Sequence, residues 1–259
     1  MATVPARYGP EFFAAIEGSS ERAAQQILPL VFDLLEPTSV ADVGCGPGVW
    51  LVEAERLGIR DSLGIDGYTP TESLRFDPER FLLHDLTAPL RLERGFDLVI
   101  CLEVAEHVDP DADGVLIESL ARLAPAVLFS AAVPSQSGQH HVNERWPAHW
   151  VELFARHELV PVDAIRPQIW SDATIPWWYR QNALLFCTRS VVEARPALRA
   201  AHEATRHQQL AVVHPELYSW IVRQRDELRA EASRVPGLRE LLRLLPGAAA
   251  RAARRRAAR

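Results

Sequence analysis

A glycine-rich stretch at residues 39–50, SVADVGCGPGVW, carries the residues with the clearest chemical meaning. It begins as a short apolar run containing Asp42, continues through glycines at every second position, Gly44, Gly46 and Gly48, and ends in an apolar segment typical of the first turns of a helix. Glycine permits positive φ and lets a ligand approach the main chain. The start of a helix offers N–H groups that lack intrahelical partners. The stretch therefore predicts a nucleotide-binding turn between a strand and a helix.

The spacing of this turn indicates which ligand it binds. A turn that binds the pyrophosphate of a dinucleotide reads G-x-G-x-x-G. Here the pattern is D-x-G-x-G-x-G, and the carboxylate of Asp42 would repel a pyrophosphate but attract a cationic or amine-bearing ligand. The pattern thus disfavours a nicotinamide-dependent oxidoreductase. A plain tight turn between a core strand and a helix remains the simplest alternative.

Acidic residues also follow the next two predicted strands. SLGID at 62–66 ends in Asp66, which lies 20 residues beyond Gly46, where a carboxylate can accept both hydroxyls of a ribose. RFLLHDL at 80–86 predicts a third strand with Asp85 near its end. Exposed loop aspartates are the alternative for both acids.

The fourth predicted strand, FDLVICLEV at 96–104, is continuously apolar in its centre, as expected for a parallel strand covered on both faces. Three ionisable residues stand at its carboxyl end: Glu103, Glu106 and His107. Ligands of open α/β sheets bind at that end of the strands. These side chains are therefore expected near the same site as the glycine turn.

Three stretches, ADVGCGPGVW, FDLVICLEVAEHV and GQHHVNERWPAHWVELF, closely resemble class I S-adenosylmethionine (SAM)-dependent methyltransferases. The resemblance covers roughly residues 20–190 and implies SAM as cofactor, with Asp85 and Leu86 at the position that binds adenine in this family. The third stretch and WWYRQNALLF resemble a bacterial subgroup that modifies sugars or natural products. The residues expected to bind the cofactor are Asp42, Gly44, Cys45, Gly46, Gly48, Asp66, Gly67, Asp85, Leu86 and Glu103.

A polar loop that follows the fifth predicted strand is expected over the reacting methyl group. A histidine of near-neutral pKa suits the removal of a hydroxyl proton. The candidates, in order, are His141, His140 and His107, with Asn143 as a possible orienting partner of His141. Together with an aromatic insertion at 167–182, the loop supplies the residues expected to bind the acceptor, namely Asn143, Glu144, Trp146, Trp170, Trp178, Tyr179 and Asn182.

The resemblance predicts methyl transfer to a small polar acceptor, with a hydroxyl preferred over an amine. A metal-dependent reaction could recruit Asp109, Asp111 and the histidines, but the sequence shows no acid pair of convincing spacing, so we expect no metal. A non-catalytic nucleotide-binding subunit is a further alternative.

These residues need a particular scaffold to come together. The resemblance implies an α/β, Rossmann-like, seven-stranded and mostly parallel sheet with helices on both faces. We expect helices at 1–36 that cover the cofactor cleft, with Ser19 or Ser20 capping the second helix. The SAM-binding core is expected at 37–190. A helical extension at 191–259, with five arginines among its last nine residues, could pair two subunits.

The amino-acid composition excludes further classes of function. All 28 basic residues are arginine, which excludes lysine chemistry, and the net charge of −6 does not indicate nucleic-acid binding. The three cysteines have no metal-ligand spacing. Without a signal-peptide pattern or a long apolar run, the sequence predicts a cytoplasmic protein that acts on a small molecule and contacts no membrane.

Overall fold

The computed structural model describes residues 10–233. The chain divides into two compact units, Met1–His214 and Pro215–Arg259. The second unit contributes one described helix, α9 (Pro215–Ser233). The arginine-rich end predicted at 251–259 lies outside the described residues. No helix in the described part of the chain combines the length and apolar character needed to cross a membrane.

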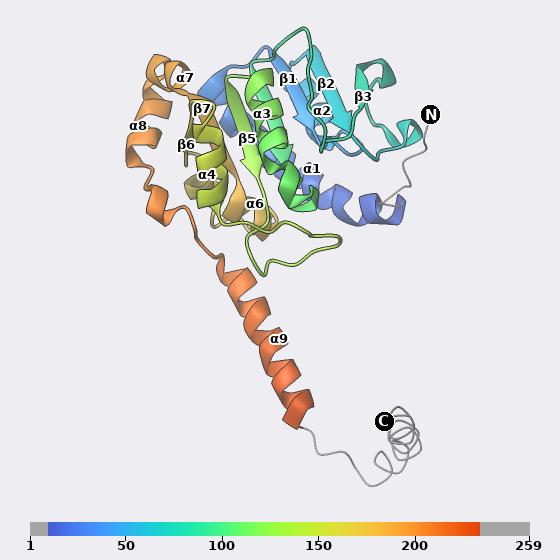
Figure 1. Cartoon of the computed structure of the whole chain (residues 1–259), viewed down its shortest axis with the longest axis vertical. Helices are drawn as coiled ribbons and strands as arrows, with labels where there is room; N and C mark the ends of the chain where they lie inside the picture. The colour runs from blue at the N-terminus through green and yellow to red at the C-terminus, as the bar shows by residue number, and fades with distance from the viewer. Residues whose placement is uncertain (1–9, 234–259) are drawn as a thin grey trace, which may run out of the picture. The chain divides into compact units, whose positions relative to one another are not determined.

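The first unit is built on a seven-stranded sheet of order β3-β2-β1-β4-β5-β7-β6 (Figure 1). β7 runs antiparallel to both neighbours, β5 and β6, and the other pairs are parallel, which confirms the predicted mostly parallel sheet. The strands are β1 (Ser39–Val43), β2 (Asp61–Asp66), β3 (Phe81–Leu83), β4 (Leu98–Leu102), β5 (Ala126–Ser130), β6 (Leu159–Val162) and β7 (Leu184–Thr188).

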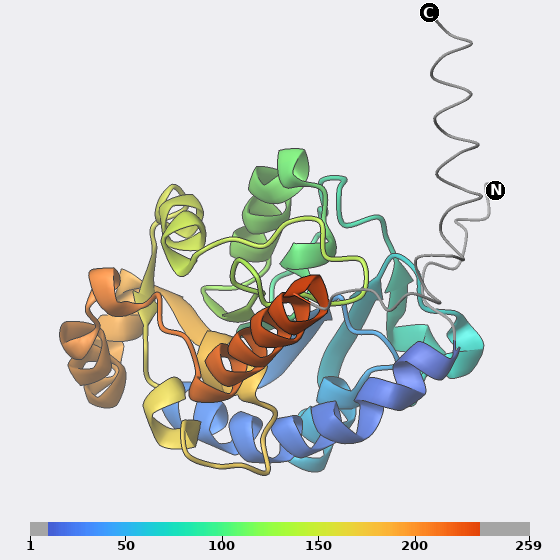
Figure 2. The ribbon, with the colours of Figure 1, turned by 90° about the horizontal axis from the view of Figure 1, so that it is seen from below.

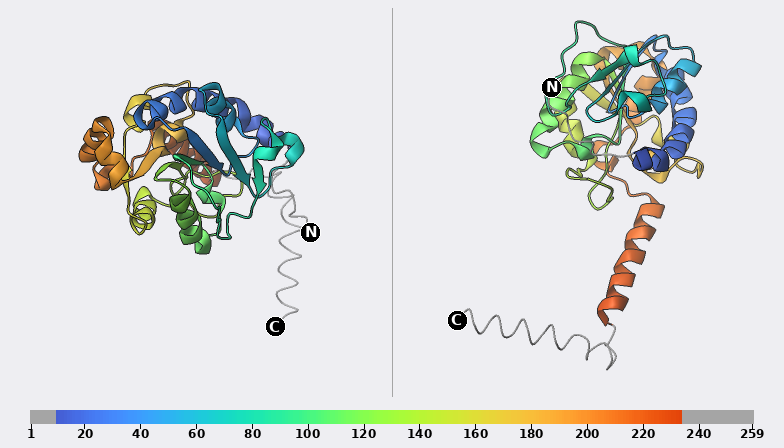
Figure 3. Two further views of the ribbon diagram at one scale, coloured as in Figure 1. Left: turned by 90° about the horizontal axis from the view of Figure 1, so that it is seen from above. Right: turned by 90° about the vertical axis from the view of Figure 1, so that its right-hand side faces the viewer.

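Helices cover both faces of this sheet. α1 and α2 lie on one face and α3 and α4 on the other, as the views from below and from above show (Figures 2 and 3). The helices of the first unit are α1 (Pro10–Leu35), α2 (Val49–Arg56), α3 (Asp113–Leu123), α4 (Pro147–Ala155), α5 (Arg166–Ile169), α6 (Trp177–Asn182), α7 (Arg189–Ala194) and α8 (Pro196–Ala204).

The apolar run of β4 is explained by this layering. Leu98 and Ile100 join the core on the α1 side, whereas Val99 and Cys101 join the core on the α3 side. Successive side chains of a strand point to opposite faces, so a strand covered on both sides is apolar at every position. All five residues of β4 are buried.

The N-terminal segment differs from the prediction of two helices. Residues 10–35 form one continuous helix, and neither Ser19 nor Ser20 caps a second one. The hydroxyl of Ser20 instead lies 3.2 Å from that of Tyr179. Ala23 and Ile27 are fully buried in the core, so packing on the sheet accounts for helix continuing past the two serines.

The first unit also continues beyond the residue 190 boundary expected for the core. α7 packs on β7 and α8 packs on β6. Val192 and Leu198 are buried in the same apolar cluster as the α1 side of the sheet. α9 begins only at Pro215, and the homodimer expected through the C-terminal helices remains a prediction.

Candidate active site

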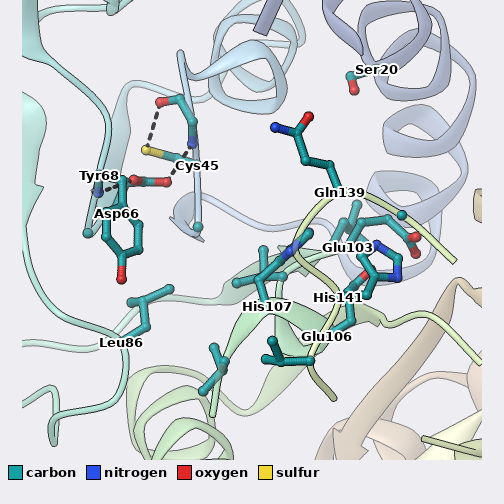
Figure 4. A pocket seen from close by; sticks show the side chains of 18 of the residues that line it. Ser20, Cys45, Asp66, Tyr68, Leu86, Glu103, Glu106, His107, Gln139 and His141 are labelled. Carbon is teal, nitrogen blue, oxygen red and sulfur yellow. Dashed lines mark hydrogen bonds between the residues drawn. The ribbon is translucent and has the colours of Figure 1, made fainter. Parts of the chain in front are cut away.

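A cavity of about 690 Å³ opens at the carboxyl ends of the central strands (Figure 4). β1 is followed by the glycine turn and β4 by Glu103, and both segments line the cavity. The chain connects β1 to β2 on one side of this point and β4 to β5 on the other, so the cavity lies where the strand order reverses. Ligands of open α/β sheets bind at this switch point. The volume is in the range of small-molecule sites.

The glycine turn is tied to the end of β2. The N–H of Gly44 donates to the carbonyl of Ile65 at 2.7 Å, and the N–H of Gly46 donates to Oδ2 of Asp66 at 3.0 Å. Gly44 and Gly46 have φ of 79° and 52° and line the cavity. These are left-handed conformations that side chains rarely adopt, so glycine is needed here for the path of the backbone.

Asp42 places an unsatisfied carboxylate oxygen in the cavity wall. The residue is 2% exposed, and its Oδ2 has no hydrogen-bond donor. Burial raises the pKa of Asp42 well above its usual value, and the negative charge of nearby Asp66 raises it further. A cationic ligand in the cavity would offset both effects, so this wall fits the sulfonium and ammonium of SAM.

Asp66 is fixed by main-chain groups at the tip of β2. Its Oδ1 accepts the N–H groups of Tyr68 and Thr69 at 2.7 and 2.9 Å. Asp85, which follows β3, also lines the cavity, and the N–H and hydroxyl of Thr87 lower its pKa. Figure 4 shows Asp66 and Tyr68 together on one side of the cavity, with Leu86 below them. Gly67 and Cys45 complete the set of predicted cofactor residues found in the wall.

The opposite side of the cavity carries two buried acids and two histidines. Glu103 has φ of 55°, and its carboxylate accepts hydrogen bonds from the side-chain amides of Gln136 at 3.2 Å and Asn182 at 3.3 Å. Burial raises the pKa of both Glu103 and Glu106, and the charge of Glu103 raises that of Glu106 further. Figure 4 shows these acids beside His107 and His141.

His141 is oriented by Glu144 rather than by Asn143, the partner expected from the sequence. Nδ1 of His141 lies 3.0 Å from Oε1 of Glu144. The same carboxylate accepts the N–H groups of Ser135 and Ser137, both at 2.7 Å. Glu144 therefore fixes the imidazole to the loop that follows β5. The rings of His107 and His141 lie close to each other, with 4.9 Å between their centroids.

Residues 16–183 match the model of a family described as a methyltransferase domain. The chain belongs to this methyltransferase family. It is a SAM-dependent enzyme, and the match overturns the alternative of a nicotinamide-dependent oxidoreductase.

Two solved structures are similar to this methyltransferase. It is similar to the sugar N-methyltransferase KedS8 from a Streptoalloteichus species, with 16% identity over 73% of this chain and 97% of that chain and a TM-score of 0.52. It is also similar to magnesium protoporphyrin IX methyltransferase from Synechocystis, solved with bound S-adenosylhomocysteine (SAH), with 18% identity over 67% and 84% of the chains and a TM-score of 0.49. A search of curated proteins finds no match.

Several residues expected at the site lie elsewhere in the methyltransferase. Gly48 starts α2 outside the cavity, and its missing side chain makes room for the ring of Phe76. His140 is exposed on the loop and turns out of the cavity wall, with φ of 61°. Asn143 is buried and donates to the carboxylate of Asp113, so it holds the loop against α3.

Only some of the residues expected to bind the acceptor line the cavity. Trp178 and Tyr179 line the cavity, together with Trp177. Trp146 is 43% exposed at the start of α4, and Trp170 packs against His214. Neither contributes to the cavity wall. Glu144 and Asn182 lie behind the residues of the cavity wall, where they form hydrogen bonds with His141 and Glu103 respectively.

Sequence reasoning missed three groups that shape the site. Gln136 is buried beside Glu103 and also accepts from Asn182 at 3.0 Å. Trp50, read only as part of a helix, lies edge-on to Tyr179 with 5.5 Å between ring centroids. Ser20 was read as a helix cap but lines the cavity. The polar character of the loop was a signal for Gln136, but no local pattern indicated the other two.

Proposed function

We propose that the enzyme methylates a hydroxyl of a small polar molecule, such as a sugar or a natural product. The main support is the pairing of His141 with Glu144 beside the acids that follow β4, on the side of the cavity opposite Asp66. A hydroxyl must lose its proton to become a good nucleophile, and this arrangement offers an acceptor for that proton. An amine acceptor would need little such help.

The cofactor, SAM, is proposed to bind through charge and hydrogen bonding. SAM supplies a methyl group on a positively charged sulfur, and the protein must align an attacking atom with it. The buried carboxylate of Asp42 would face the positive charges, and Asp66 would accept from the ribose hydroxyls. Asp85 and Leu86 would recognise adenine through a carboxylate and a main-chain N–H.

The proton would pass to His141. In the neutral imidazole with its proton on Nδ1 toward Glu144, Nε2 would accept a hydrogen bond from the substrate hydroxyl. The negative charge of Glu144 would stabilise the imidazolium that forms. This division of roles is the one that histidine–carboxylate pairs serve in other enzymes.

The remaining wall is suited to an acceptor with both apolar and polar parts. Trp177, Trp178 and Tyr179 line the cavity from α6, while Gln139 reaches it from the loop after β5. Aromatic faces pack well against the apolar face of a ring, and the amide provides hydrogen bonds. Ser20 of α1 also lies in the wall, which supports the expectation that the N-terminal helix covers the bound cofactor.

Paired acceptors test the proposal. Methyl transfer would be measured with small sugars and phenols, each matched to an analogue with an amine in place of the hydroxyl. We expect transfer to hydroxyls, and a loss of about 100-fold in kcat for His141→Gln. Transfer to the amine analogues alone, with less than a tenfold effect of His141→Gln, would contradict it.

A further inference from the structure

Glu106, His107 and His141 form a compact group of metal-ligating side chains. Each offers one ligand atom, and these atoms all lie within 4.8 Å of one another. Glu106 and His107 follow β4, and His141 comes from the loop after β5. The main-chain carbonyl of Glu106 accepts the N–H groups of Val142 and Asn143 at 2.9 and 3.1 Å. The two segments are therefore fixed together at the cavity wall.

Both imidazoles have an oxygen acceptor near Nδ1. Nδ1 of His107 lies 3.4 Å from the carbonyl of His140, and Nδ1 of His141 lies 3.0 Å from the carboxylate of Glu144. An acceptor at Nδ1 places the proton there and leaves Nε2 unprotonated. Histidines that ligate metals are typically held this way, by a carbonyl or carboxylate on the nitrogen away from the ion.

Glu106 supplies an independent reason to expect a cation. Its side chain is 0% exposed, and neither carboxylate oxygen has a hydrogen-bond donor. It also stands next to Glu103, the other acid at the end of β4. The sequence offered no convincing acid pair, but the turn after β4 brings these two together. A buried carboxyl group in this position either keeps its proton or is compensated by a positive charge, and a bound cation would supply that charge.

We infer that Glu106, His107 and His141 bind a divalent transition-metal cation, with Glu103 next to Glu106 as the proton acceptor. Two imidazole nitrogens and a carboxylate suit zinc, iron, cobalt or manganese better than calcium. Bonds of about 2.1 Å place ligand atoms roughly 3 to 4 Å apart, so the group needs only a small side-chain contraction.

The role of this cation rests on the proposed hydroxyl acceptor. Bound to the cation, the hydroxyl oxygen would lose its proton more easily. The O–H bond breaks and the proton passes to Glu103, the oxygen forms a bond to the methyl carbon, and the C–S bond breaks with its electron pair on sulfur. With the cation bound, His141 would act as a ligand, so Glu103 replaces it as the proton acceptor and only the hydroxyl acceptor of the proposed function is kept.

Metal binding can be measured without any acceptor. The full-length protein would be stripped with a chelator, saturated with SAH, and titrated with Co²⁺ alone, followed by visible absorption. We expect one saturable equivalent, and at least a tenfold weaker affinity in His107→Ala and Glu106→Gln. His140→Gln is the matched control, because the carbonyl that contacts His107 remains, and its affinity should equal that of the wild type.

Glu144→Gln gives a second test that leaves all proposed ligands in place. Loss of the carboxylate behind His141 should weaken Co²⁺ binding about 10- to 100-fold. SAH titration of each variant reports whether it is folded. Wild-type protein that binds SAH but no Co²⁺, or variants that all bind Co²⁺ equally, would overturn the metal site. Loss of Co²⁺ in the ligand variants would support the site even if only amines prove to be methylated, so its failure and that of the proposed function are distinguishable.

Discussion

Gly138 and His141 are packed so closely that a methyl group on Gly138 would overlap the imidazole at Nε2, Cε1 and Cδ2. Gly138 lies in the loop after β5 and lines the cavity beside the histidine. The small residue therefore determines where the imidazole can sit.

Gly138→Ala should move His141 away from the cavity. We expect kcat to fall about 10- to 100-fold, because a displaced catalytic group loses its alignment. SAH affinity should stay within about twofold, since the cofactor residues lie across the cavity. The matched control is Gly114→Ala in α3, where an added Cβ meets nothing within 4 Å and activity should not change. Equal activity in the two variants would contradict this role of Gly138.

Asp66 and Asp85 should determine cofactor affinity. Replacing either with alanine removes a charged hydrogen-bond acceptor, and such bonds contribute about 1.5–3 kcal/mol. We expect the Kd for SAH to rise about 10- to 100-fold in isothermal titration. Asp77→Ala is a control, because Asp77 caps a short helical turn outside the cavity. Unchanged SAH affinity in both Asp66→Ala and Asp85→Ala would place the nucleoside elsewhere.

Asp42→Asn should stabilise the ligand-free protein and weaken cofactor binding. The pKa of Asp42 is raised in the folded state. At a pH between its pKa in the unfolded chain and its pKa in the folded protein, Asp42 is therefore protonated when folded and ionised when unfolded. Stability therefore falls as pH rises through that window, and asparagine removes this loss. At pH 8 we expect a gain of about 1 kcal/mol or more, seen as a Tm higher by about 2–4 °C.

The pH dependence provides the check on Asp42. Thermal unfolding of wild type and Asp42→Asn would be followed at several pH values from 4 to 8. The Tm difference should grow with pH, and the variant should bind SAH at least tenfold more weakly because the attraction to its ammonium is lost. Parallel Tm profiles would mean that Asp42 does not titrate as its burial implies.

Tyr179 and Ser20 should couple α6 to α1 in the wall of the cavity. Their hydroxyls lie 3.2 Å apart, and a hydrogen bond of this kind contributes about 1 kcal/mol. Tyr179→Phe and Ser20→Ala should each lower the free energy of unfolding by about that amount in urea titrations. The double variant should be no worse than either single one. Fully additive losses would show that the two hydroxyls act separately.

The fold followed from local patterns in the sequence. Apolar strands ended by turns, and a glycine turn before a helix, are features of neighbouring residues, so they are readable without tertiary structure. Three strand-end acids predicted for the cofactor, Asp66, Asp85 and Glu103, line the cavity for the same reason, because parallel strands end at one edge. The misread break at Ser19 and Ser20 shows the limit, since burial against the sheet overrode the capping signal.

The orientation of side chains in the loop after β5 depended on contacts between residues that are distant in the sequence. The sequence by itself indicated the enzyme class and the seven-stranded fold through the resemblance of its motifs to class I methyltransferases. The individual strands and the acids at their ends followed from local patterns. Only the tertiary structure decided that Glu144 rather than Asn143 orients His141, that His140 faces away, and that Glu106 meets two histidines. A side chain's direction in an irregular loop is set by its packing partners, and no periodicity in the chain records them.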